Sequence, residues 1–494
     1  MYHMDLANGC WLPSHVLVEL LRHVNGDEAR NVAAVSKLWR ACLWESRSIV
    51  EFRVGESGSA SSAVHELATR FPLSTTLRVV ARPLRPFDLS RFSLCRPLAF
   101  PSRLSTLELH KVQIDAGTLD GLLHASQLRV IKCSHVEFID VARWKHSVPV
   151  ASSASGEPHS TGPASVTSLS LTDCQFLTAR GVGRQAEKKK ALSAFLRAFG
   201  GVAELTLESM ELSDGLLGGY LAGLDDLATL NLAGSRGFSY RAIARVQRFK
   251  LKELVLSACY VLNEDMCRVI CTVCPGLETL GVYEGQISTT TVNLISSLSH
   301  LKTLDMGYSD GDVSPIDLQR MLARLKGLRV LNLGGVAAVN DFVMLEVARM
   351  ASLKRCALTL ACVGDRRRRR SHSRHALRSF ASHRSFASLA SERLDISGCP
   401  SVTSDGYGSL RKLESLEELS CGWTSTFGDD EVEALPPSIV DLDVSYASRL
   451  TDVGLARMSE RLAGLRRLKL TSCKGLTSEG IRKVSQRNRG LLVC

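Results

Sequence analysis

A chain of 494 residues is too long for one compact core, because single cores stop growing at roughly 250–300 residues. Hydrophobic residues make up 45% of the sequence, which excludes wholesale disorder. The net charge is +11, but the nine arginines and one glutamate between Arg366 and Arg393 account for +8 and leave +3 for the rest. We therefore expect a folded, repetitive chain whose body is nearly neutral.

Neither a membrane span nor a secretory leader is expected. No apolar run approaches the roughly 18 residues needed to cross a bilayer, and the first residues lack a basic stretch followed by an apolar core. The fifteen cysteines are odd in number and lie in a long chain, which favours reduced, buried thiols over a disulfide framework. These features predict a soluble chain without a membrane partner, in the cytoplasm, the nucleus or both.

The first pattern along the chain is amphipathic and lies between residues 12 and 24. Its apolar positions recur at helical spacing on one face, and Pro13 suits a first helical turn. After a turn at 25–27, a second apolar pattern runs through Val35 and Trp39. Two such short helices cannot enclose a core of their own, so we predict a small helical module at 11–50 that packs on a partner.

This module resembles an F-box. The resemblance rests on Leu12-Pro13, on the paired aliphatic residues that follow, and on Val32-Ala33-Ala34-Val35-Ser36-Lys37-Leu38-Trp39-Arg40. In that family the module docks onto the Skp adaptor of a cullin-based ubiquitin ligase. The resemblance implies an adaptor-binding surface made of Leu12, Pro13, Val16, Leu17, Leu20, Leu21, Val35 and Trp39. The alternative is that these side chains cap the first repeat of a solenoid.

Residues 51–100 are weakly patterned and are expected to be a connector, in which 64–79 is a candidate degenerate repeat. From residue 101 to 494 the strand signature Leu-x-x-Leu-x-Leu recurs, typical of leucine-rich repeats. Well-formed copies include Leu104-Leu107-Leu109, Leu227-Leu230-Leu232, Leu328-Leu331-Leu333 and Leu465-Leu468-Leu470. From residue 202 the repeats begin at 227, 251, 277, 301 and 328, which is the spacing of this class, roughly 20–29 residues.

Each repeat is predicted to supply one strand and one returning helix, as at 265–274 and 452–461. A single repeat cannot bury its apolar face, whereas stacked repeats bury a continuous leucine ladder. The predicted fold class is an α/β leucine-rich-repeat solenoid. We expect a curved horseshoe with parallel strands on the concave face and helices outside.

Several repeats continue with a cysteine three residues after the last strand position, as at Cys174, Cys259, Cys399 and Cys473. A Leu/Val-Thr phrase often follows, in which Thr403, Thr451 and Thr477 are expected to cap the next helix. These features look like the cysteine-containing repeats of F-box proteins. Two stretches interrupt the period, at about 144–165 and 364–391, and are expected to be inserted loops.

A ligand is expected on the concave strand face. Strand positions beside the ladder carry more carboxylates (Glu204, Glu208, Glu253, Asp305, Glu418, Asp441 and Asp443) than cations (Arg393, Arg467 and Lys469). This excess predicts a partner segment with basic residues. Aromatic residues, which often anchor interfaces, follow several strands, although they could instead pack on neighbouring turns. The substrate-binding candidates are Tyr283, Asp305, Tyr308, Trp423, Asp443 and Tyr446.

Other chemistries are disfavoured. Cys267, Cys271 and Cys274 lack a matching ligand pair at zinc-finger spacing, so no metal or cofactor is expected. The sequence contains no phosphate loop and no hydrolase signature, which predicts that the chain is not an enzyme. The near-neutral body makes nucleic acid an unlikely partner. The Arg/Ser-rich stretch at 366–385 is a solvated loop, a nuclear localisation patch or a phosphorylation-controlled segment.

Together, the module and the repeats resemble the F-box leucine-rich-repeat family. The resemblance implies a non-catalytic substrate receptor of an SCF-type ubiquitin ligase. The module would bind a Skp-type adaptor and through it a cullin, and the repeats would recruit an unknown protein substrate for degradation. The alternative is a protein-interaction scaffold that is not coupled to ubiquitination. The substrate itself cannot be identified, since specificity lies in the variable surface positions.

Overall fold

The structure is a computed structural model of the whole chain. It describes residues 2–4, 11–13, 49–54, 74–81, 87–88, 104–115, 128–140, 166–177, 184–246, 250–309, 311–358, 392–488 and 490–494. The chain divides into two compact units, Met1–Gln247 (unit 1) and Arg248–Cys494 (unit 2). Each unit contains its own series of stacked repeats.

The first described elements are two short strands, β1 (Tyr2–Met4) and β2 (Trp11–Pro13), which pair antiparallel with His3 opposite Leu12. Leu12 and Pro13 therefore lie in extended backbone, and the prediction of a first helical turn at Pro13 is wrong. An edge strand tolerates proline because its outward side needs no backbone N–H donor. The other residues of the predicted adaptor surface, from Val16 to Trp39, lie outside the described residues.

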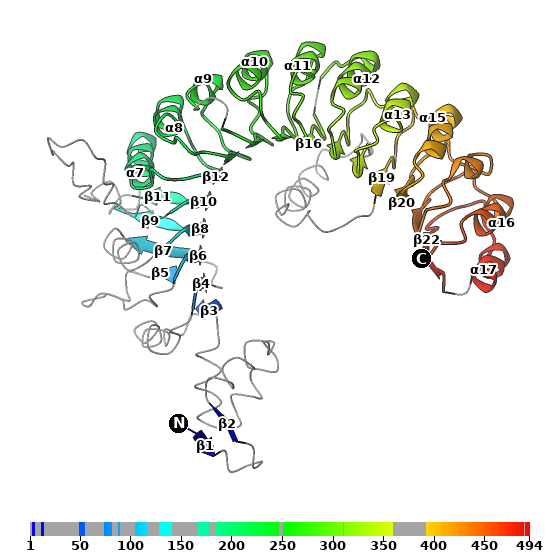
Figure 1. Cartoon of the computed structure of the whole chain (residues 1–494), viewed down its shortest axis with the longest axis horizontal. Coiled ribbons are helices and arrows are strands. Elements are labelled where there is room, and N and C mark those ends of the chain that lie inside the picture. Colours follow the sequence, from blue (N-terminus) through cyan, green and yellow to red (C-terminus); the bar gives the residue numbers. More distant parts are fainter. Residues whose placement is uncertain are drawn as a thin grey trace. The chain divides into compact units, whose positions relative to one another are not determined.

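Unit 1 contains a parallel sheet with one strand from each repeat (Figure 1). Its strands are β3 (Ile49–Val54), β4 (Thr76–Ala81), β6 (Thr106–His110), β8 (Val130–Ser134), β10 (Ser168–Thr172), β12 (Glu204–Glu208) and β13 (Thr229–Asn231). The register aligns one buried residue from each of six strands: Leu77, Leu107, Ile131, Leu169, Leu205 and Leu230. The predicted ladder is therefore the core of this unit, and it includes strands that precede residue 101.

Unit 1 also contains short strands that the sequence did not predict. A small parallel sheet is formed by β5 (Phe87–Asp88), β7 (Val112–Asp115), β9 (Glu137–Ile139) and β11 (Gln175–Leu177). The cause is an alternating pattern, since Val112 and Ile114 are buried while their neighbours are not. Helices α7 (Gln185–Arg197), α8 (Asp214–Leu221) and α9 (Tyr240–Ile243) follow in chain order. The stretches that follow β7 and β9, residues 116–127 and 141–165, lie outside the described residues.

Unit 2 has the layer order that the sequence predicts, with helices along one side of its sheet (Figure 1). The parallel strands are β14 (Glu253–Val255), β15 (Thr279–Gly281), β16 (Thr303–Asp305), β17 (Val330–Asn332), β18 (Arg355–Ala357), β19 (Glu392–Asp395), β20 (Leu416–Ser420), β21 (Asp441–Asp443), β22 (Arg467–Lys469) and β23 (Leu492–Val493). Each pairs with the next in chain order.

The second layer of unit 2 consists of helices and two short 3-10 turns. The helices are α10 (Glu264–Val273), α11 (Thr289–Ile295), α12 (Pro315–Arg324), α13 (Asp341–Val347), α15 (Ser404–Gly408), α16 (Asp452–Arg461) and α17 (Ser478–Arg487), and the 3-10 turns are η4 (Ser409–Lys412) and η5 (Glu431–Ala434). Thr451 and Thr477 cap α16 and α17, which confirms their predicted role. Thr403 stands at the N-cap of α15 without a capping bond from its side chain.

The backbone turns in the same way after many strands. Four residues beyond the central leucine, φ becomes positive, and this position is glycine in some repeats (Gly335, Gly398) and a larger residue in others (Trp423, Tyr446). The left-handed turn aims the backbone N–H at the next repeat: Trp423 N–H donates to the Ser445 carbonyl at 2.8 Å. The recurring turn therefore links adjacent repeats by backbone hydrogen bonds.

The cysteine of the repeat pattern also joins neighbouring repeats. The thiol of Cys399 donates to the Leu358 carbonyl at 2.8 Å, and Cys473 makes the equivalent bond to Val444 at 3.2 Å. A serine can replace it, since the hydroxyl of Ser235 donates to the carbonyl of Leu207 at 2.6 Å. This position therefore supplies a small hydrogen-bond donor for an otherwise buried carbonyl.

Candidate protein-binding surface

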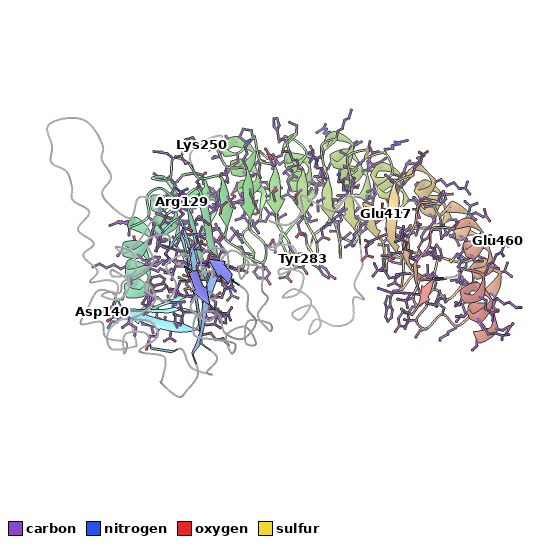
Figure 2. All side chains as sticks on the ribbon, turned by 60° about the horizontal axis from the view of Figure 1, so that its bottom comes forward. Arg129, Asp140, Lys250, Tyr283, Glu417 and Glu460 are labelled. Carbon is purple, nitrogen blue, oxygen red and sulfur yellow. The ribbon has the colours of Figure 1, made fainter. Side chains whose placement is uncertain are left out.

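The strand face of unit 2 carries two rows of side chains between β18 and β22, all of them polar except Ala357. The row before the central residue of each strand is Arg355, Arg393, Glu418, Asp441 and Arg467, and the row after it is Ala357, Asp395, Ser420, Asp443 and Lys469. These positions alternate with buried ladder residues, so they face away from the core. In Figure 2, Glu417 on β20 and Glu460 on α16 mark the strand side and the helix side of this unit.

The charges of these rows are paired with one another across neighbouring strands. The three ion pairs are Arg393 with Glu418 at 2.5 Å, Arg467 with Asp441 at 2.8 Å, and Lys469 with Asp443 at 3.4 Å. Exposed pairs of this kind contribute about 0–1 kcal/mol each, so they fix side-chain positions more than they stabilise the fold. The carboxylate excess read from the sequence is therefore offset here, although the carboxylates still form a central group between flanking cations.

Trp423 and Tyr446 form an aromatic pair at the ends of β20 and β21. Their ring centroids are 3.6 Å apart and the rings are inclined by 19°, which is a stacked arrangement. Trp423 is 57% exposed and Tyr446 is 37% exposed. Large aromatic side chains that remain exposed beside charged groups are characteristic of protein interfaces. These two candidates are brought together by the structure.

The candidates on β15 and β16 have a different environment. Tyr283 is only 3% exposed and packs against the half-buried Tyr308, with ring centroids 5.3 Å apart. Asp305 is also buried, and its carboxylate accepts hydrogen bonds from the Asn332 amide at 2.8 Å and the Gly307 N–H at 3.1 Å. Burial raises the pKa of Asp305 to about 7 despite these bonds. Tyr283 thus fits the alternative of packing on a neighbouring turn, and it does not join the exposed pair.

Other carboxylates predicted for the strand face are also shielded. Desolvation raises the pKa of Glu208 on β12, although a hydrogen bond from the Thr172 hydroxyl opposes this shift. Desolvation likewise raises the pKa of Glu253 on β14. The strand face is therefore not one uniform acidic surface, and exposed charge together with exposed aromatic area is found at β19–β22.

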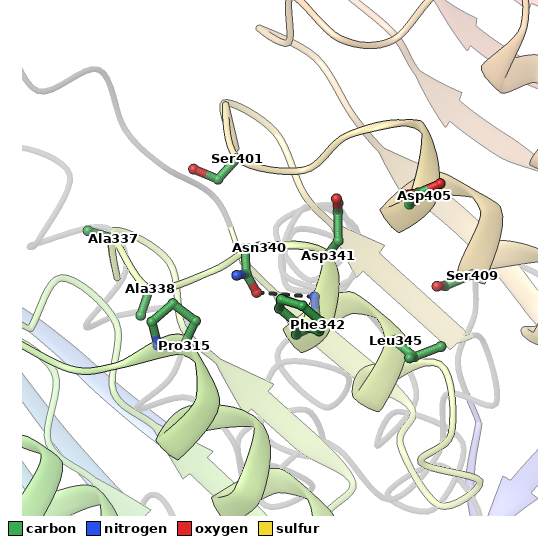
Figure 3. Close-up of a pocket in the computed structure, with 10 residues that line it drawn as sticks. All are labelled: Pro315, Ala337, Ala338, Asn340, Asp341, Phe342, Leu345, Ser401, Asp405 and Ser409. Atoms are coloured by element: carbon green, nitrogen blue, oxygen red, sulfur yellow. Dashed lines mark hydrogen bonds between the residues drawn. The ribbon is translucent and has the colours of Figure 1, made fainter.

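The helix layer of unit 2 contains a groove of about 490 Å³ (Figure 3). It lies where α13 packs directly against α15, although β18 separates their strands β17 and β19 in the sheet. Phe342, which is 57% exposed, faces the groove together with Pro315 and Leu345, and Asp405 lies on the opposite side. This groove could not be predicted from the sequence, in which the nearest sign is the interrupted repeat pattern at 364–391.

The cysteines of the described residues lie mostly in the core of the repeats. Within those residues no group of His, Cys, Asp and Glu side chains could hold a metal ion. Cys267 and Cys274 are buried, and desolvation raises the pKa of each to about 12. No helix in the described part of the chain is both long enough and apolar enough for a bilayer span.

No protein-family model matches this sequence, and no curated protein matches it. Solved structures match at low similarity. They include yeast Rad7 in its complex with Elc1 (14% identity, 66% of this chain, 80% of that chain, TM-score 0.38), a leucine-rich-repeat protein of Leptospira interrogans (11%, 93%, 92%, 0.37) and TLR13 in its complex with ssRNA13 (15%, 93%, 60%, 0.43). The strands, the turns and the repeat spacing of this chain are those of a leucine-rich-repeat fold.

Proposed function

We propose that this chain is a non-catalytic receptor that captures a protein substrate for an SCF-type ubiquitin ligase in the cytoplasm or nucleus. The observation that carries the binding role is the exposed Trp423–Tyr446 stack beside the charged rows of β19–β22. A rigid sheet presents these side chains at fixed spacings, which favours recognition of another macromolecule over chemistry on a small molecule. Coupling to the ligase rests on the F-box resemblance of residues 11–50.

Coupling is tested by co-purification of a Skp-type adaptor and a cullin with the full chain. The double variant Leu17→Asp, Leu20→Asp should lose both, because charge on the apolar helical face opposes docking in a partner groove. The matched control is Leu17→Met, Leu20→Met, which keeps the face apolar and should retain both. Circular dichroism of each variant checks that the repeats stay folded. Adaptor recovery with the Asp variant at the level of the unaltered chain would reject the adaptor surface.

Absence of the adaptor and the cullin from the unaltered chain as well would leave the second candidate, a protein-interaction scaffold. That candidate uses the same strand face of unit 2, since the aromatic pair and the charged rows need no ligase to bind a protein. The two candidates therefore differ only in the role of residues 11–50, and a truncation that begins at residue 51 separates binding by the repeats from coupling to the ligase.

A further inference from the structure

We infer that the strand face at β19–β22 binds an extended protein segment with a central arginine flanked by acidic residues. This inference rests on the proposed protein-binding role and adds the chemistry of the partner. It depends on three features of unit 2: the backbone conformation of Trp423 and Tyr446, their stacking, and the order of charges across the strands.

The first feature is that two bulky residues occupy a backbone position suited to glycine. Trp423 has φ of 58° and Tyr446 has φ of 63°, whereas the same turn contains glycine in some repeats (Gly335) and small residues in others (Ala258, Ser472). Left-handed backbone is unfavourable for side chains with a Cβ, and glycine adopts it freely. The turn forms equally with glycine, alanine or serine, so it does not require the aromatic side chains of Trp423 and Tyr446.

The second feature is the orientation of the pair. With ring centroids 3.6 Å apart and an angle of 19° between the planes, the two rings lie face to face, and each has only its outer face left for further stacking. More than half of Trp423 is open to solvent. A planar guanidinium group stacks on such a face, and the same group forms forked hydrogen bonds with carboxylates; a lysine ammonium does both less well.

The third feature is the order of charges across the sheet. The carboxylates Glu418, Asp441 and Asp443 lie on the central strands β20 and β21, with Arg393 on β19 and Arg467 on β22. Neighbouring strands are about 4.8 Å apart, so each outer cation lies about 7 Å from the middle of the carboxylate group. An extended chain covers that distance in about two residues. The complementary segment therefore reads acid-x-Arg-x-acid.

The existing ion pairs do not block this segment. Arg393 and Glu418 are paired, but their side chains remain 48% and 27% exposed. Exposed pairs are weak, so a guanidinium group of the partner can bind between Glu418 and Asp441. Acidic residues of the partner can then pair with the N–H groups of Arg393 and Arg467 that Glu418 and Asp441 no longer hold. Because each charge then has an opposite neighbour on both sides, the pattern also rejects segments of the reverse polarity.

The test is a selection from a displayed library of random seven-residue peptides on the immobilised full chain. We expect at least tenfold enrichment of peptides with acid-x-Arg-x-acid. The variant Trp423→Gly, Tyr446→Gly should lose the enrichment, and the control Ala258→Gly, Ser472→Gly, which makes the same change at two left-handed turns without aromatic residues, should keep it. No enrichment, or enrichment of peptides without a central basic residue, would overturn the inference.

A second variant separates binding from folding. Glu418→Gln, Asp441→Asn removes central charge without touching the aromatic pair, and should abolish the preference for arginine at the centre. A preference that persists in this variant would overturn the inference, and so would enrichment that survives loss of both aromatic residues. Adaptor co-purification from the same preparations reports the ligase coupling independently, so failure of one proposal is distinguishable from failure of the other.

Discussion

Asp341 and Thr403 are 62 residues apart in the chain, yet both carboxylate oxygens of Asp341 accept hydrogen bonds from Thr403. The Thr403 N–H donates at 2.7 Å and its hydroxyl at 2.6 Å. The same contact joins Asp452 to Thr477, only 25 residues away. The contact at Asp341 therefore joins two repeats that have β18 between their strands, and it closes the helix layer beside the groove in Figure 3.

Breaking this contact should weaken the joint between α13 and α15. We expect Asp341→Ala and Thr403→Ala each to lower the free energy of unfolding, and a double-mutant cycle to give a coupling energy of about 1 kcal/mol. Urea denaturation followed by circular dichroism measures it. Thr403→Ser keeps the hydroxyl and is the control that should cost least. Strictly additive effects of the two alanine changes would mean that the contact is not energetically coupled.

The sequence predicted the features that depend on burial and spacing. Ladder residues such as Leu331 and Leu468 must be apolar at fixed intervals, and the capping roles of Thr451 and Thr477 follow from side-chain chemistry close by in the chain. The contact between Asp341 and Thr403 could not be predicted, because it joins helices α13 and α15, which are not in successive repeats. Sequence period alone shows only that the repeat is interrupted.

Some features of the candidate surface could likewise be predicted from the sequence, and others could not. Asp443 could be chosen as a charged residue at a variable strand position, and Trp423 and Tyr446 as aromatic residues just after strands. The stacking of the two rings could not be predicted, since it results from two left-handed turns in adjacent repeats. Tyr283 lies one position earlier in its repeat than Trp423 and Tyr446 do, and it is buried beside Tyr308, which has their position.

The hydrogen bond from Cys399 predicts which substitutions its position will accept. Valine is apolar and of similar size but removes the donor, leaving the buried carbonyl of Leu358 without this bond, so Cys399→Val should cost about 1–3 kcal/mol of unfolding free energy. Cys399→Ser keeps a donor, as Ser235 does in another repeat, and should cost less. Parallel denaturation curves measure both variants. If serine proves more costly than valine, packing rather than hydrogen bonding governs this position.

The rate of alkylation should differ between the exposed Cys494 and the buried cysteines Cys267 and Cys274. Among the described cysteines Cys494 is exposed, whereas Cys267 and Cys274 are buried with pKa values raised to about 12. Alkylation needs an accessible thiolate, so iodoacetamide at pH 8 should modify Cys494 well before Cys267 and Cys274, which should stay intact until the protein unfolds. Mass spectrometry of the digested protein identifies each site. Rapid native labelling of Cys267 would show that α10 opens readily or that its thiol is not buried.

The buried carboxyl group of Asp305 predicts how stability changes with pH. Its pKa is raised from 3.8 to about 7, because burial penalises the ionised form. A raised acid pKa means that the folded state binds the proton more tightly than the unfolded state. The contribution of Asp305 to stability is therefore greatest below about pH 4, falls as pH rises towards 7, and is lowest above that.

The substitution Asp305→Asn removes the charge but keeps an oxygen that can accept hydrogen bonds from Gly307 and Asn332. Relative to the unaltered chain, we expect Asp305→Asn to gain stability at pH 8, on the order of 2–4 kcal/mol, and to lose that advantage as pH falls towards 4. Urea denaturation at pH 4.5, 6 and 8 measures the difference. Asp395→Asn is the matched control, because Asp395 caps Ser397 at the same repeat position but is only half-buried. A gain for Asp305→Asn that is equal at all three pH values would show that ionisation of Asp305 is not its cause.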